Sequence, residues 1–262
     1  MRLDLAGKTA VVTGASRGIG LAVAQALVRE GVNVTAGALN GSAELIALRD
    51  EGGLKVVLDD LTTTAGCQAL VDAAVDEFGG VDILVNNVGG VRPRTEGFLE
   101  VTDTDWLWAL DVNLLSAVRA TRAAVPHLLE RAPTAITTIC SVNATLPDPG
   151  VIDYSAAKAA LRSFSKSLSK ELGPAGVRVN TVSPGPVETA LWLGAGGVAE
   201  TVGLARGLDP AEVRQAAVTG TPTGRFSRPT EVAQLVLFLS SAAAGNVTGA
   251  DVLIDGGMVT TV

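Results

Sequence analysis

The chain has 262 residues, 47% of them hydrophobic, and a formal net charge of −7. This length and apolar content predict one large domain with a well-buried core. Lysine and arginine are scattered and form no basic stripe, which argues against binding to nucleic acid. No segment has the length of a membrane span, and the first residues lack the apolar core of a signal peptide. We therefore expect a cytoplasmic protein without nucleic-acid or membrane partners.

Short runs rich in valine, isoleucine and leucine alternate with longer alanine-rich segments of helical periodicity. This alternation is typical of an α/β domain, in which helices cover both faces of a parallel sheet. The predicted strands are Thr9–Thr13, Asn33–Gly37, Lys55–Leu58, Ile83–Val85, Ala135–Ser141, Arg178–Val182 and Asp251–Ile254. The predicted helices are Ile19–Arg29, Ala43–Asp50, Ala65–Phe78, Thr104–Arg131, Tyr154–Leu172 and Thr230–Leu239.

Two places interrupt this rhythm. Pro126, late in the fourth predicted helix, predicts a kink or an early stop, because proline has no backbone N–H to donate. The segment at about 186–225 contains several glycines and prolines around the apolar run Leu191–Leu193. We expect it to be a substrate lid, because so long a connection inside a compact domain is usually functional. The alternative is a solvent-exposed insertion, which would leave Trp192 in water at a cost.

The sequence offers few residues for metal or thiol chemistry. Cys67 and Cys140 lie far apart, and the one histidine, His127, falls in an apolar stretch. This pattern excludes zinc spacing and a histidine-based triad, and we predict no metal. The chemistry must then come from hydroxyls, amides, carboxylates, lysine or a bound cofactor.

A glycine-rich turn follows the first predicted strand, in the run Thr13-Gly14-Ala15-Ser16-Arg17-Gly18-Ile19-Gly20. Glycines let the backbone turn tightly and approach a pyrophosphate, whose charge is favoured at the N-terminus of the next helix. The spacing is G-x-x-x-G-x-G and differs from the common G-x-G-x-x-G fingerprint. Alternatively, the strand-to-helix turn needs glycine for its geometry alone.

Tyr154 is the only tyrosine, and Lys158 follows it four residues later. On a helix these residues share a face, so the ammonium of Lys158 would lie beside the phenol and favour its ionised form. The ordinary pKa of tyrosine, about 10, is too high for ready proton exchange near neutrality. The pair predicts a proton donor, Tyr154, and a residue that adjusts its pKa, Lys158. The alternative is that both are ordinary solvent-exposed side chains, which are common at this spacing.

Taken together, these segments resemble the compact, single-domain branch of the short-chain dehydrogenase/reductase family over essentially the whole chain. The matching pieces are Thr13–Gly20, Asp60-Leu61, Asn86-Asn87-Val88-Gly89, Val112-Asn113-Leu114, Ser141, the Tyr154/Lys158 pair, Pro184-Gly185 and Asp255-Gly256-Gly257. The resemblance implies a Rossmann-like, doubly wound, seven-stranded parallel sheet in one domain spanning residues 1–262. It also implies an NAD(P)-dependent oxidoreductase that acts on a secondary alcohol or ketone.

The resemblance also implies which residues bind the cofactor. They are Gly14, Ser16, Arg17, Gly18, Ile19, Gly20, Leu39, Asp60, Leu61, Asn87, Gly89, Tyr154, Lys158, Pro184, Gly185, Val187 and Thr189. Asp60 matches a residue that contacts the adenine, and the segment from Pro184 matches one that holds the nicotinamide amide. After the second strand, Ala38, Leu39 and Asn40 include no acid to exclude a 2′-phosphate. We therefore favour NADP(H) over NAD(H), since Arg17 could reach that phosphate. The preference is slight, because Leu39 replaces an arginine that is frequent in NADP-using relatives.

Four residues form the implied catalytic set: Asn113, Ser141, Tyr154 and Lys158. In the reductive direction Tyr154 would protonate the developing alkoxide while Ser141 polarises the carbonyl. Lys158 would lower the phenol pKa and bind the nicotinamide ribose, and Asn113 would hold a water that connects Lys158 to solvent. Two of them have a structural alternative, namely a backbone hydrogen bond for Ser141 and a solvent-facing side chain for Asn113.

The substrate pocket is the least determined part of the sequence. Asn143, Trp192 and Leu193 are candidates to line it. Two alternatives to the general oxidoreductase remain, a reductase of 3-oxoacyl thioesters and a cofactor-binding protein that acts as a sensor or scaffold without turnover. By resemblance we expect a homotetramer or homodimer.

Overall fold

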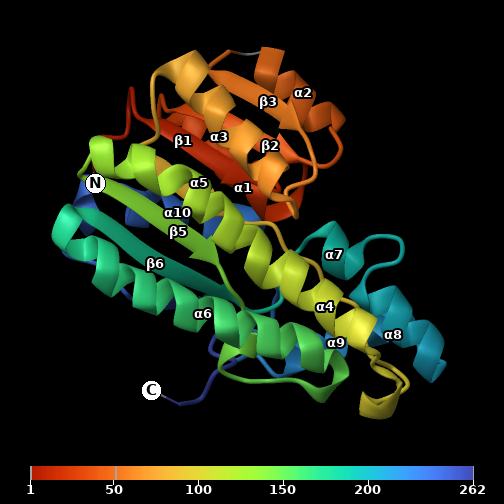
Figure 1. Cartoon of the computed structure of the whole chain (residues 1–262). Helices are drawn as coiled ribbons and strands as arrows, with labels where there is room; N and C mark the ends of the chain where they lie inside the picture. Colours follow the sequence, from red (N-terminus) through yellow and green to blue (C-terminus); the bar gives the residue numbers. More distant parts are fainter. Residues whose placement is uncertain (1, 51, 262) are drawn as a thin grey trace.

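The computed structural model describes residues 2–50 and 52–261. Its centre is a seven-stranded, all-parallel sheet with the order β3-β2-β1-β4-β5-β6-β7 (Figure 1). The strands are β1 (Thr9–Thr13), β2 (Asn33–Ala38), β3 (Leu54–Leu58), β4 (Ile83–Asn86), β5 (Thr134–Ile139), β6 (Val177–Pro184) and β7 (Asp251–Ile254). The order reverses between β1 and β4, and ligands bind beside such a switch point at the carboxyl ends of the strands. The predicted doubly wound fold is confirmed.

Helices cover both faces of the sheet. One layer contains α1 (Gly18–Arg29), α2 (Ala43–Asp50) and α10 (Pro229–Ser240), and the other contains α3 (Thr64–Phe78), α5 (Ser116–Glu130) and α6 (Ile152–Leu172). Figure 1 shows α5 and α6 running side by side in front of β5 and β6. Val12 packs in the first layer and its neighbour Val11 in the second, because successive strand residues point to opposite faces. This two-sided burial explains the continuous apolar runs in the sequence.

The predicted fourth helix, Thr104–Arg131, consists of three parts. α4 (Asp103–Leu110) passes through a π-helical turn, η2 (Asp111–Leu115), into α5. The predicted early stop at Pro126 is wrong, because α5 continues to Glu130. Pro126 and Arg122, whose carbonyl loses a partner, both lie on the exposed side of α5, while Leu128 is buried in the core beyond them. Water can bond the free carbonyl, and the packing of the last turn holds the helix together.

The fifth strand is shorter than predicted. β5 ends at Ile139, so Ser141 lies two residues beyond it and not at its last position. The Ser141 Oγ accepts a hydrogen bond from the Asn143 N–H at 3.2 Å and caps the short helix η3 (Val142–Ala144). Ser141 is therefore fixed by a cap, where a hydroxyl competes well for backbone N–H groups.

The long segment after β6 contains three helices, α7 (Ala190–Leu193), α8 (Val198–Arg206) and α9 (Pro210–Thr219). In Figure 1 the teal helices α7 and α8 lie beyond the ends of the strand arrows. Within residues 2–50 and 52–261, no helix is long and apolar enough to cross a membrane.

A cluster around Asp82 joins the opposite, amino-terminal edge of the sheet. The Asp82 carboxylate accepts a hydrogen bond from the Thr9 N–H at 2.8 Å and lies 3.2 Å from Nη2 of Arg131 and 3.4 Å from Nζ of Lys8. Its side chain is only 4% exposed. The cluster therefore joins the starts of β1 and β4 to the end of α5.

Candidate active site

A cavity of about 770 Å³ lies at the carboxyl edge of the sheet. Its size is within the range of small-molecule sites. The cavity is lined by all but two of the residues proposed for cofactor binding and catalysis. The exceptions are Gly20 and Asn113, which lie directly behind the lining.

The glycine turn between β1 and α1 forms one end of this cavity. Gly14 and Gly18 have φ of +67° and +58°, which side chains other than glycine rarely adopt. A Cβ at Gly20 would lie 2.3 Å from the Gly14 carbonyl oxygen, so this turn closes only with glycine there. The first turn of α1 has no side-chain cap. Its free N–H groups and positive dipole end suit a pyrophosphate.

Asn87 fixes the glycine turn to the end of β4. Its Nδ2 donates to the carbonyl oxygens of Thr13 and Gly14 at 3.1 and 2.9 Å, and its backbone N–H donates to Oγ1 of Thr13 at 2.9 Å. The neighbouring Asn86 is buried and donates to Oγ1 of Thr121 at 3.0 Å, which connects β4 to α5. Asn87 thus shapes the turn and Asn86 supports the sheet.

The end of the cavity that is expected to hold the adenosine lies beyond β2 and β3. Asp60 is exposed and lines it, and its Oδ1 accepts from the N–H and Oγ1 of Thr62 at 2.9 and 2.7 Å. These two hydrogen bonds lower the pKa of Asp60, so its carboxylate is charged at neutral pH. Leu39 is 66% exposed here, and Arg17 is exposed nearby. The glycine cradle and these polar groups fit a nicotinamide adenine dinucleotide.

The segment that follows β6 lines the middle of the cavity with Pro184, Gly185, Val187 and Thr189. A Cβ on Gly185 would lie 3.0 Å from Cα of Asp255, which explains the glycine by close packing against the chain after β7. Thr189 lies against Gly18, whose added Cβ would be 3.2 Å from Thr189 Cγ2. The predicted nicotinamide segment therefore adjoins the glycine turn.

Ser141, Tyr154 and Lys158 come together in the cavity wall. Lys158 is 3% exposed, and its Nζ donates to the Ile139 carbonyl at 3.1 Å and lies 5.7 Å from the centre of the Tyr154 ring. Burial raises the pKa of Tyr154 to about 12, and a hydrogen bond with Ser141 opposes that rise. Burial also lowers the pKa of Lys158. The lowering of the phenol pKa by Lys158 stays a prediction.

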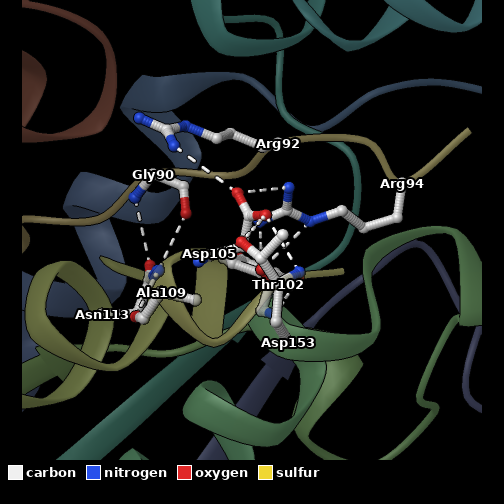
Figure 2. A network of polar contacts seen from close by, with 9 residues as sticks. Gly90, Arg92, Arg94, Thr102, Asp105, Ala109, Asn113 and Asp153 are labelled. Carbon is white, nitrogen blue, oxygen red and sulfur yellow. Dashed lines mark hydrogen bonds and ion pairs between the residues drawn. The ribbon is translucent and has the colours of Figure 1, made fainter. Parts of the chain in front are cut away.

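Asn113 lies in the π-helical turn behind this wall and is fully buried, so the solvent-facing alternative is wrong. Its Nδ2 donates to the carbonyls of Gly90 and Ala109 at 2.8 and 3.0 Å, and its Oδ1 accepts from the Gly90 N–H at 3.1 Å (Figure 2). A Cβ on Gly89 would lie 3.1 Å from Asn113 Oδ1 and 3.3 Å from Lys158 Nζ. Asn113 and Lys158 thus meet behind Gly89.

The remaining part of the cavity is mostly apolar. Asn143 lines it, with its Oδ1 accepting from the Ser141 Oγ at 3.2 Å, and so does Trp192, whose ring packs edge-to-face on Phe226 at 5.5 Å between centroids. Leu193 does not line it, and this prediction is corrected. Residues two apart on a helix point in nearly opposite directions, so Leu191 faces the cavity in its place.

Sequence reasoning missed much of this apolar wall. The additional residues include Val91, Leu146, Pro147, Pro149, Val151, Val198, Ala217 and Met258. They come from five separate places in the chain, and no single motif connects them. The one local signal for this wall was the proline-containing stretch just before Tyr154, because a segment so close in sequence must lie near the reactive groups. Beyond Arg17 and Asp60 at the adenosine end, the charged residues of the lining are Lys158 and Asp148.

The chain matches known proteins over almost its whole length. A family profile described as enoyl-(acyl carrier protein) reductase matches residues 14–259. A 3-oxoacyl-(acyl-carrier-protein) reductase of Vibrio cholerae is 35% identical over 258 residues, which cover 98% of this chain and 99% of that protein. The chain belongs to the short-chain dehydrogenase/reductase family. It is therefore an NAD(P)-dependent oxidoreductase that acts on CH–OH or C=O groups.

Other relatives in this family carry different names. A 3β-hydroxysteroid dehydrogenase of Eggerthella lenta is 35% identical over 263 residues, covering 97% of this chain and 95% of that protein. The crystal structure of L-sorbose reductase from Gluconobacter frateurii, in complex with NADPH and L-sorbose, matches with a TM-score of 0.90 at 33% identity and covers both chains fully. Relatives of similar identity thus act on thioesters, steroids and sugars, and the family alone leaves the substrate open.

Proposed function

We propose that this member of the short-chain dehydrogenase/reductase family interconverts a secondary alcohol and a ketone with NADP(H). The observation that carries the proposal is the shared cavity, in which Ser141, Tyr154 and Lys158 lie next to a glycine turn shaped for a dinucleotide. The bound nicotinamide would supply or accept the hydride. The protein's own residues would then bind the carbonyl and move the proton.

In the reductive direction the Tyr154 hydroxyl donates its proton to the developing alkoxide, and the Ser141 hydroxyl donates a hydrogen bond to the same oxygen. The high pKa of Tyr154 in the free protein keeps this proton in place at neutral pH. Lys158 lies within reach to stabilise the phenolate that remains. Asn113 supports the wall behind Lys158. It is proposed to hold a water that connects Lys158 to solvent, so that the proton lost by Tyr154 is replaced.

The preference for NADP(H) has two supports. No acid follows β2, where Leu39 and Asn40 are exposed, and Arg17 lies exposed at the same end of the cavity. In addition, the related L-sorbose reductase is described with NADPH. Dissociation constants for NADPH and NADH, measured by titration calorimetry, test the preference. Equal or tighter binding of NADH would overturn it.

We further propose that the substrate is uncharged and largely apolar around its carbonyl. The pocket beyond the reactive groups is lined by aliphatic side chains, prolines and Trp192, and its charged residue besides Lys158 is Asp148. A carboxylate or phosphate would find no arginine there to pair with. Residues 186–225 supply part of this wall through α7 and α8, which supports their proposed role as a lid.

The second candidate is reduction of 3-oxoacyl thioesters, favoured by the names of the family profile and of the Vibrio cholerae relative. A panel decides between the two: cyclic ketones, linear ketones, 3-oxoacyl thioesters, keto acids and sugars, followed by NADPH absorbance. Highest kcat/KM for a neutral ketone supports the first proposal, and highest kcat/KM for a thioester supports the second. Binding of NADPH without turnover of any member would support the sensor or scaffold.

A further inference from the structure

A loop after β4 folds back over the beginning of α6, the helix that carries Tyr154. Arg94 lies in this loop, and its backbone N–H donates to the Gly150 carbonyl at 2.7 Å. Its side chain is 12% exposed and points toward the first turn of α6 (Figure 2). An arginine turned inward on a loop needs paired acceptors, because an unpaired buried charge is costly.

Asp153 supplies the main acceptor and is 1% exposed. Its Oδ2 accepts from Nη2 and Nε of Arg94 at 2.5 and 3.1 Å, and its Oδ1 accepts from the backbone N–H of Tyr154 at 2.9 Å. One carboxylate therefore connects the Arg94 guanidinium to the backbone of the reactive tyrosine. Asp153 is the one residue that links the two.

The guanidinium also binds the beginning of α4. Nη1 of Arg94 donates to Oδ1 of Asp105 at 2.9 Å, and the same carboxylate forms a capping box with Thr102 through its Oδ2. Arg92 approaches Asp105 at 3.9 Å and stacks on Trp108 with its Cζ 3.8 Å from the ring centre. Arg94 thus holds α4 and α6 in fixed relation at the cavity wall.

We propose that Arg94 and Asp153 are positioning residues for Tyr154, fixing the first turn of α6 through the Tyr154 backbone N–H and neutralising the carboxylate that binds it. The proposal rests on the proton-transfer role proposed for Tyr154. Forked hydrogen bonds from arginine define a geometry as well as an attraction, whereas a buried ion pair adds little net stability compared with apolar packing. The geometry of the Arg94–Asp153 pair is therefore better explained by the positioning of Tyr154 than by a contribution to the stability of the fold.

The charges around the phenol make a distinctive prediction. Tyr154 is faced by Lys158 from α6 and by Ser141 and Cys140 from the end of β5, and Asp153 is its sequence neighbour. Asp153 itself is faced by Arg94, with Asp105 and Arg92 beyond. Removing the guanidinium would leave an unpaired carboxylate on the residue next to Tyr154 and favour the neutral form of the phenol. Removing the carboxylate charge would have the opposite effect.

The single tyrosine allows this to be measured without turnover. Phenolate absorbance is recorded within milliseconds of a pH jump, before the chain unfolds, for wild type, Arg94→Met, Asp153→Asn and the double variant. We expect the phenolate to form at higher pH in Arg94→Met and at lower pH in Asp153→Asn, by roughly half a unit to one unit each. The double variant should return toward wild type. Unchanged titrations in both single variants would overturn the proposal.

Turnover supplies an independent readout with a matched control. Arg94→Met should lower kcat by roughly 10- to 100-fold, as expected for a misplaced catalytic group, with the Kd of NADPH changed by less than about threefold. Arg94→Lys should restore part of this loss. Arg131→Met removes the comparable partner of the buried Asp82 at the opposite edge of the sheet. It should lower stability while leaving kcat and the phenol titration as in wild type.

The outcomes separate this proposal from the proposed function. A wild-type protein without oxidoreductase activity would refute the function, while the phenol titrations still test the connection between Arg94, Asp153 and Tyr154. An active wild type whose Arg94→Met variant loses only stability, like Arg131→Met, would refute positioning and leave the function intact.

Discussion

At the scale of single residues, the Tyr154 hydroxyl carries the proposed proton transfer. The Tyr154 side chain lines the cavity, and the hydrogen bond to Asp153 comes from the Tyr154 backbone N–H, which a phenylalanine would keep. Tyr154→Phe should therefore keep α6 intact and lower kcat by roughly 10²- to 10⁴-fold, the usual contribution of a general acid. Steady-state kinetics with the best ketone, together with NADPH binding, checks this. Near-normal turnover would refute the role of the phenol.

Gly20 gives a second prediction at this scale. A Cβ there would meet the Gly14 carbonyl at 2.3 Å, and backbone cannot move aside as a flexible side chain can. Gly20→Ala should open the turn and weaken NADPH binding by at least about tenfold, because the pyrophosphate depends on the position of the turn.

Gly173→Ala is the matched control, because Gly173 has helical φ and ψ and nothing within 4 Å of an added Cβ. Calorimetric titration with NADPH should give wild-type affinity for this variant. Equal affinities for the two variants and wild type would show that the glycine turn tolerates a side chain.

Most of the residues predicted from the sequence line one cavity, because the loops and helix ends that carry them lie where the parallel strands end at a common edge. Leu193 was misplaced because the direction of a side chain on a four-residue helix depends on where that helix starts. Arg94 was missed for a related reason: nothing local distinguishes a buried arginine from a solvated one. Its partners Asp105 and Asp153 are 11 and 59 residues away.

At the scale of elements, the proposed lid meets the cavity through α7. Trp192→Ala should raise the KM for substrate and lower kcat/KM by roughly tenfold, since a large apolar contact and its packing on Phe226 are lost. Binding of NADPH should change little. Leu193→Ala on the same helix is the control, because Leu193 lies outside the cavity. Equal losses in both variants would point to a disturbed helix and not to a lost substrate contact.

Element boundaries show where sequence patterns fail. The periodicity of residues 104–131 predicted one helix, and the π-helical turn within it could not be read from that pattern. In the turn the Ser116 N–H donates a hydrogen bond to the Asp111 carbonyl, five residues back. The Ser116 hydroxyl donates to the Val112 carbonyl at 2.6 Å. Asn113 reaches across to Gly90, so the irregular turn depends on tertiary contacts. Such turns are frequent at functional sites.

At the scale of the whole molecule, the buried phenol predicts how stability depends on pH. Burial raises the pKa of Tyr154 from 10.0 to about 12, so the folded protein holds this proton more tightly than the unfolded chain. Its contribution is complete below pH 10.0 and is lost as the pH rises through about 12. The expected loss is no more than about 3 kcal/mol, since each pKa unit corresponds to about 1.4 kcal/mol.

Chemical denaturation of wild type and Tyr154→Phe across this pH range measures the contribution as a difference. Burial lowers the pKa of Lys158 from its ordinary 10.5, which gives a stability change of opposite sign that both proteins share. The variant should lose less stability than wild type as the pH rises. Parallel curves would show that the phenol has an ordinary pKa.

The assembly and cellular location stay predictions. Leu99, Phe98 and Leu107 are 90%, 62% and 67% exposed around the beginning of α4, which is consistent with the homodimer or homotetramer expected for this family. Light scattering would measure the mass in solution. A monomeric protein would contradict the expected oligomer without affecting the site within one chain.

The Asp82 cluster stabilises the edge of the sheet that lies opposite the catalytic loops. It fastens the starts of β1 and β4 and the end of α5, whereas the apolar wall of the cavity is made by loops at the other ends of the strands. Segments such as 146–151 and 190–198 can therefore be exchanged for foreign sequences while the foundation stays in place. Relatives named as a sorbose reductase, a hydroxysteroid dehydrogenase and a 3-oxoacyl-(acyl-carrier-protein) reductase show how far one scaffold can diverge in this way. For this chain, we expect that grafting loops from relatives onto the cavity wall would change substrate specificity while the sheet and its helices stay folded.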